Sequence, residues 1–194
     1  MKLILFLLMA GARLGATAAP PNWDGEYPPC DHHTDLMIRE HTDLGVRIST
    51  SNQALARQFA RAMDFWAEVL DIDWHEVHTQ DCSIEVLDGA AELFDSDAIA
   101  ARAQSPDRSA FQGWIAFNPA SRLTARELFV VSVHEIGHLL GLPHNPSGSS
   151  VMFFLNLDDS VSLDATDLTA LAARHKLRTM TSDGVTNVEV TMPN

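Results

Sequence analysis

The chain has 194 residues, of which 46% are hydrophobic, and its formal net charge at pH 7 is -13. This length favours one compact domain, and the apolar content is sufficient for a buried core. So acidic a surface would repel phosphate backbones and anionic lipids. The composition therefore argues against nucleic-acid binding and against binding to a membrane surface.

The first 18 residues have the pattern of an export signal. Lys2 gives a positive start, residues 3–10 form an apolar run, and residues 16–18 are small, as a cleavage site requires. The run is too short to span a bilayer. The alternative is a buried N-terminal helix. We expect residues 1–18 to be removed and the mature protein to be secreted, extracellular and monomeric, without membrane insertion.

The two cysteines, Cys30 and Cys82, form an even pair. In an oxidising compartment such a pair predicts a disulfide, which would stabilise the fold by about 4 kcal/mol on the chain-entropy account. Two alternatives stay open. Cys30 supplies a thiolate to a metal in a latent form, or both thiols are free.

Beyond a Pro-rich lead at residues 19–35, the first half of the chain predicts strands around one long helix. Alternating apolar and polar residues at 44–50 predict a strand, and a stripe of large apolar residues over 52–70 predicts an amphipathic helix. Further strands are predicted at 74–77, 82–87 and 112–117, whereas residues 99–103 are ambiguous between strand and helix.

A second helix has clear signals at both ends. Thr124 and Glu127 form a capping box, in which each side chain satisfies a backbone amide at the helix start. The helix is predicted to run to Leu140, because Gly141 can adopt the left-handed conformation that ends a helix.

The last helix is predicted over residues 165–175, opened by Asp164 with Asp167. The tail, 179–194, is polar with no firm pattern. No repeat or linker divides the chain, so we predict one domain, residues 36–178.

The residues that carry chemistry lie in the second helix. His134 and His138 are four apart and so share one helix face, which lets both imidazoles point at one ion. Glu135 adjoins the first ligand, where its carboxylate can reach the open position of the metal. The turn at Gly141 brings the chain back to present His144. Three neutral imidazoles leave a fourth tetrahedral position for water, which is typical of a catalytic zinc site.

The pattern His134-Glu-x-x-His138-x-x-Gly141-x-x-His144, followed by Met152, resembles the metzincin clan of zinc metalloendopeptidases and is most similar to a matrixin catalytic domain. The resemblance implies an α+β fold with a twisted mixed sheet, a long helix, a zinc-binding active-site helix, a methionine turn and a C-terminal helix. It implies one catalytic Zn²⁺, Glu135 as the base, and protein or peptide substrates.

The resemblance also implies roles for residues outside the motif. Met152 would lie beneath the zinc, although a plain core methionine is the alternative. Asp167 would tie the closing helix to the methionine turn, although a simple helix-start acid is equally consistent with the sequence. An extended substrate would pair with an edge strand that includes Ile99, Ala100 and Ala101.

Four departures from the matrixin pattern stand out. Matrixins carry Ser or Thr after the third ligand, and here the residue is Asn145. A Tyr expected after the methionine is replaced by Phe153 and Phe154, which would line the specificity pocket. Histidines for a second, structural zinc are replaced, near Arg102 and by Ala116, so we expect no second zinc.

The fourth departure is that we expect no long prodomain with a cysteine-switch motif. The lead at residues 19–35 is then the candidate latency segment, in which Cys30, Asp31 or Asp24 would block the zinc. Calcium binding is left open. The acidic residues available for it are Asp95, Asp97, Asp158 and Asp159, but clusters of acids are more often simply solvated. The alternatives to an endopeptidase are a zinc-stabilised peptide-binding module without catalysis, a metzincin of another family, and a hydrolase of another amide.

Overall fold

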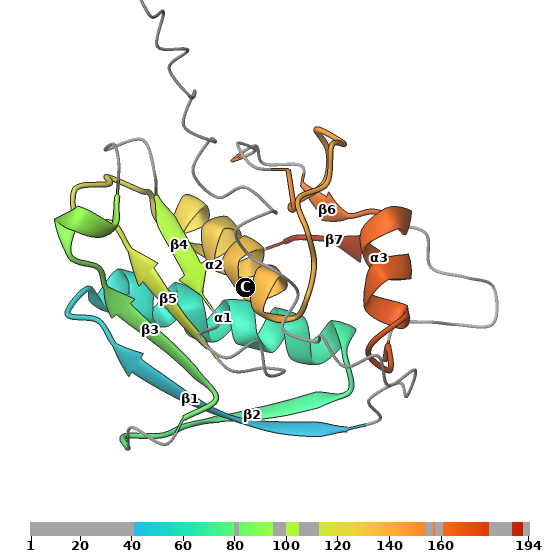
Figure 1. Ribbon diagram of the computed structural model, residues 1–194, viewed down its shortest axis with the longest axis horizontal. Coiled ribbons are helices and arrows are strands. Elements are labelled where there is room, and N and C mark those ends of the chain that lie inside the picture. The colour runs from blue at the N-terminus through green and yellow to red at the C-terminus, as the bar shows by residue number, and fades with distance from the viewer. Residues whose placement is uncertain are drawn as a thin grey trace, which may run out of the picture.

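The computed structural model describes residues 41–79, 82–94, 100–104, 113–153, 157, 161–178 and 188–191. They form a mixed sheet of five strands against which two helices, α1 and α2, pack, and a third helix, α3, lies beside a small two-stranded sheet (Figure 1). The fold class predicted from the sequence is confirmed.

The main sheet has the strand order β2-β1-β3-β5-β4. All its pairs are parallel except β4 with β5, which is antiparallel. β4 therefore forms one edge of the sheet, and the ambiguous segment near residue 100 is a strand. The strand bounds are β1 Thr42–Ser49, β2 Ile72–Glu76, β3 Ile84–Asp88, β4 Ala101–Gln104 and β5 Gly113–Phe117, with a short 3-10 helix, η1, at Ala91–Leu93.

Helix α1, Gln53–Val69, is the predicted amphipathic helix. The Asn52 side chain accepts hydrogen bonds from the amides of residues 54 and 55, which satisfies orphan donors at the helix start. Trp66 is fully buried, and its indole Nε1 donates to the carbonyl oxygen of Val133 in the next helix at 3.1 Å. This bond fixes the depth at which α1 packs against the helix that carries the histidines.

Helix α2, Ala125–Leu139, begins and ends as predicted. Its capping box between Thr124 and Glu127 is present, and Gly141 has a φ of 95°. Residues 128–139 are all buried, so α2 is the central helix of the domain. The buried imidazole of His175 lies against its end and bonds the Leu140 carbonyl oxygen at 2.8 Å.

The closing part of the chain contains more structure than its sequence suggested. Helix α3, Ala165–Ala172, begins where the sequence predicted, and Asp164 and Asp167 form a capping box there. It ends at Ala172 and not at His175, because the chain turns at residues 173–174. It is preceded by strand β6, Ser162–Leu163, which pairs with strand β7, Val188–Glu189, from the segment that we expected to be a patternless tail. Val190 is buried in the core.

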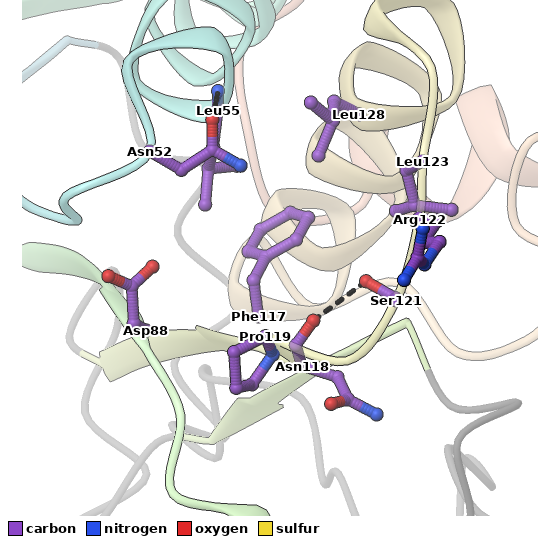
Figure 2. Close-up of a pocket in the computed structure, with 10 residues that line it drawn as sticks. All are labelled: Asn52, Leu55, Asp88, Phe117, Asn118, Pro119, Ser121, Arg122, Leu123 and Leu128. Atoms are coloured by element: carbon purple, nitrogen blue, oxygen red, sulfur yellow. Dashed lines mark hydrogen bonds between the residues drawn. The ribbon is translucent and has the colours of Figure 1, made fainter.

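A pocket of about 100 Å³ lies where α1 and α2 begin (Figure 2). Its walls include Asn52, the N-cap residue of α1, and Leu55 in the first turn of that helix. Arg122, just before α2, and Leu128, in the first turn of α2, also line it. None of the predicted metal ligands lines it, so this pocket is separate from the candidate site. No helix in the described parts of the chain combines the length and the apolar character needed to cross a bilayer.

Replacing Trp66 by Phe tests how the two long helices are held together. The substitution keeps an aromatic ring but removes the donor to Val133 and leaves space in a close-packed core, so we expect a loss of about 1–3 kcal/mol in the free energy of unfolding. Urea denaturation would measure it. An unchanged midpoint would show that this bond does not matter for the packing of α1 on α2.

A three-histidine metal centre

The imidazoles of His134, His138 and His144 converge on one point. The Nε2 atom of His138 lies 3.1 Å from that of His134 and 3.2 Å from that of His144. Ligands at 2.0–2.1 Å from a tetrahedral zinc are separated from one another by about 3.3–3.4 Å. The spacing of these nitrogen atoms therefore fits a shared ion, and among the described residues this is the group of acidic, histidine or cysteine side chains placed to hold one.

Backbone carbonyls determine which ring nitrogen faces the metal. The Nδ1 atom of His134 lies 2.7 Å from the carbonyl oxygen of Val151, and Nδ1 of His138 lies 2.9 Å from that of Leu142. A carbonyl oxygen can only accept, so both Nδ1 atoms carry the hydrogen. Each Nε2 atom then keeps its lone pair for a metal ion.

The end of α2 shapes the return of the chain. Gly141 donates to the carbonyl of His138 at 3.0 Å, and Leu142 donates to that of Gly137 at 2.9 Å. These two bonds form a Schellman motif, which requires the positive φ that glycine adopts without strain. The same turn carries the Leu142 carbonyl back to the His138 ring and places His144 opposite the helix.

Glu135 and Met152 lie beside the part of α2 that carries the two helical histidines. Glu135 follows the first histidine and is 2% exposed. The side chain of Met152 is fully buried and packs closely against α2 at Gly137. A Cβ atom added at Gly137 would lie 2.7 Å from the Sδ atom of Met152 and 3.3 Å from the ring of Trp66. Gly137 is thus the position between the two helical histidines where only a hydrogen fits beneath the methionine.

Asn145, one of the four departures from the matrixin pattern, has a structural role that the sequence did not reveal. Its Nδ2 atom donates to Asp164 at 3.0 Å and to Asp167 at 2.9 Å, and its own amide donates to the Met152 carbonyl at 3.0 Å. Asp167 also accepts from Ser150 at 2.7 Å. One amide group therefore holds two carboxylates and joins the loop after His144 to the start of α3.

Asp167 combines the two roles that the sequence left open. It completes the capping box of α3, and it bonds the side chains of Ser150 and Asn145. Burial raises the pKa of this carboxyl group above its usual range, although these hydrogen bonds oppose the shift.

The proposed substrate-binding residues are placed in part. Ala101 begins the edge strand β4, and Ala100 precedes it and accepts a hydrogen bond from the amide of Asn118. Phe153 is half-buried next to Met152. Ile99 and Phe154 lie outside the described residues, and substrate binding by all five stays a prediction.

The replaced second-zinc positions face each other, because Arg102 on β4 pairs with Ala116 on β5. Of the predicted disulfide, Cys82 is a free cysteine in the structure. Its partner Cys30 lies outside the described residues, so the bridge has no structural support and stays a prediction. The four acids considered for calcium, and the whole 19–35 lead, also lie outside them.

Burial keeps the imidazoles of His134 and His138 neutral. It lowers the pKa of His134 to about 4, opposed by the hydrogen bond to Val151 and reinforced by positive charge on His144. Burial likewise lowers the pKa of His138 well below its usual value. Both rings are therefore in the form that binds metal at neutral pH.

The sequence model of the Matrixin family matches residues 40–175, which contain the sheet, the three helices and all three histidines. The chain belongs to the matrixin family. A rat (Rattus norvegicus) protein, macrophage metalloelastase, is 30% identical over an alignment of 105 residues, which covers 49% of this chain and 22% of that protein. The chain therefore aligns with less than a quarter of this relative. Matrixins bind zinc, and the three histidines supply a group positioned for it.

Asn145→Asp tests the junction between the metal loop and α3. The variant keeps the side-chain shape but replaces the shared donor by a third carboxylate beside Asp164 and Asp167, so we expect about 3 kcal/mol lower stability and at least about tenfold weaker zinc binding. Urea denaturation and competition with a chromogenic chelator would measure the two effects. Asn145→Ser, which restores the residue type of other matrixins without adding charge, should lose less. Equal losses in both variants would contradict the charge argument.

The metal-free protein should lose stability in mild acid. Because the folded-state pKa of His134 is about 4 and the usual value is 6.5, the unfolded chain binds a proton that the folded chain excludes. Stability is thus greatest above pH 6.5 and should fall by about 3 kcal/mol as the pH drops toward 4. Urea midpoints between pH 7.5 and 4.5 would show it. The carboxyl of Asp71, whose hydrogen bond with Lys176 lowers its pKa to about 2, acts only below this window. A flat profile would contradict burial of neutral ligands.

Proposed function

We propose that the protein is an exported zinc-dependent endopeptidase that hydrolyses peptide bonds of extended protein segments. The observation that carries the proposal is the convergence of three imidazole Nε2 atoms beside a buried glutamate, within the histidine pattern of the matrixin family. The name of the relative, a metalloelastase, supports a protein substrate.

His134, His138 and His144 would hold the zinc ion through their Nε2 atoms. A zinc ion with three neutral ligands lowers the pKa of a bound water toward neutrality and polarises a carbonyl oxygen. The hydrogen bonds of Val151 and Leu142 keep two of these rings in the correct tautomer and orientation before any ion arrives.

Glu135 is the proposed general base. It lies one residue from the first ligand on a buried helix turn. Its carboxylate would accept the proton of the attacking water and return it to the departing amine. A site that only held metal would have no use for this carboxylate. Its presence therefore favours an enzyme over a zinc-stabilised binding module.

The substrate is proposed to lie extended along β4. This strand is at the edge of the sheet and packs against α2, so its outer side can pair with a peptide backbone by β-strand addition. Ile99, Ala100 and Ala101 would contribute these backbone bonds, while Phe153 and Phe154 would line the pocket for the side chain after the cut bond. Recognition through main chain favours unfolded or extended substrates.

Export is part of the proposal. The signal-like residues 1–18 support secretion, and matrixins are generally extracellular. The acidic chain supports a soluble extracellular protease that acts as a monomer on other proteins.

The decisive experiment is digestion of unfolded casein by the purified mature protein. We expect cleavage that phenanthroline abolishes and added zinc restores. Glu135→Gln should lower kcat/KM about 10²–10⁴-fold, the usual contribution of a general base, with zinc content and stability unchanged. Glu68→Gln, which removes an exposed glutamate of α1, serves as the matched control and should cut normally.

Two outcomes would contradict the proposal. Full activity of Glu135→Gln would discard the proposed base. Stoichiometric zinc in a wild-type protein that does not cut casein would indicate a peptide-binding module instead of a protease.

A further inference from the structure

The domain continues beyond the segment that the family shares. The matrixin match ends at residue 175, yet residues 188–191 are folded onto the same core (Figure 1). Val188 and Glu189 form strand β7, which pairs antiparallel with β6, and the Val190 amide donates to the Val161 carbonyl at 3.0 Å. Val190 is 1% exposed, so this contact is part of the hydrophobic core.

Strand β6 is in turn bonded to the turn that holds the first metal ligand. The amide of Val151 donates to the carbonyl of Ser162 at 2.8 Å, and the amide of Ser162 donates to the carbonyl of Ser149 at 3.0 Å. The carbonyl of Val151 then accepts from Nδ1 of His134 at 2.7 Å. A continuous series of backbone hydrogen bonds therefore leads from β7 through β6 to a ligand imidazole.

Arg126 closes this series on the same helix. Its Nη1 atom donates to the Val190 carbonyl at 2.9 Å. Arg126 and His134 are eight residues apart on α2, which corresponds to about 12 Å along the helix axis. Helix α2 thus bonds both ends of the unit formed by β7, β6 and the turn at residues 149–152.

We propose that residues 188–190 are a positioning strand for the metal centre, anchored by Arg126, which fixes the Val151 carbonyl and hence the orientation of the His134 ring. The inference rests on the proposed zinc site but not on proteolysis. The turn at 149–152 has little regular structure of its own, and groups that orient a ligand typically change metal affinity 10–100-fold when they are lost.

Two test variants and two matched controls, all made in the mature chain, test this inference. The first ends at residue 187 and lacks the strand. The second, ending at residue 191, keeps the strand and is the matched truncation control. The third is Arg126→Gln in the full chain, matched by Arg57→Gln at an exposed position of α1, which removes the same charge without touching Val190.

The measurements are the zinc dissociation constant by chelator competition, and the Tm of each variant without and with zinc. A purely structural strand would lower both Tm values equally. A positioning strand also reduces the rise in Tm that zinc produces, because that rise depends on the dissociation constant. We expect about tenfold weaker zinc binding for the chain ending at 187, a smaller loss in the same direction for Arg126→Gln, and no change in either control.

Unchanged zinc affinity in both test variants, with equally lowered Tm values, would overturn the inference and leave the strand a structural one. If the chain ending at 187 does not fold, Arg126→Gln decides alone by the same two readouts. Casein cleavage measured in parallel separates the proposals. A wild-type chain that binds zinc but does not cut refutes the protease and leaves the positioning strand standing.

Discussion

The metal centre depends on two hydrogen bonds from imidazole Nδ1 atoms to backbone carbonyls. The carbonyl oxygens of Val151 and Leu142 fix the tautomer and the ring orientation of the two helical histidines. Helix geometry alone places His134 and His138 on one face, but it leaves each ring free to rotate about its χ angles. The carbonyls remove that freedom, and both come from irregular chain beyond α2. The accuracy of the site is therefore set by whatever holds the loop between Gly141 and Met152.

Burial acts on this centre in two opposite ways. Enclosing the rings of His134 and His138 disfavours their charged forms and so keeps the lone pairs that a metal ion needs at neutral pH. The same burial means that, in mild acid, the folded state does not bind protons that the unfolded chain binds. The property that prepares the ligands thus restricts the pH range in which the metal-free protein is stable.

The parts of the structure that the sequence predicted are those encoded by neighbouring residues. The capping box of Thr124 and Glu127, the four-residue spacing of the histidines and the glycine that ends α2 all act within one or two helix turns. The pairing of β7 with β6, by contrast, joins two-residue strands far apart in sequence, and so short a strand has no periodicity to detect. The hydrogen bonds from Asn145 to Asp164 and Asp167 likewise join residues far apart in sequence and follow no periodic pattern.

Both features that the sequence concealed answer one physical problem. A three-histidine site of this kind takes its third ligand and its supporting turn from outside the helix, where regular backbone hydrogen bonds do not hold them. Asn145 supplies side-chain bonds on one side of the loop by pairing Asp164 with Asp167. The ladder from Val190 through β6 supplies backbone bonds on the other side. The first set of bonds lies next to His144, and the second leads to the Val151 carbonyl that orients His134. The loop is therefore held from both flanks.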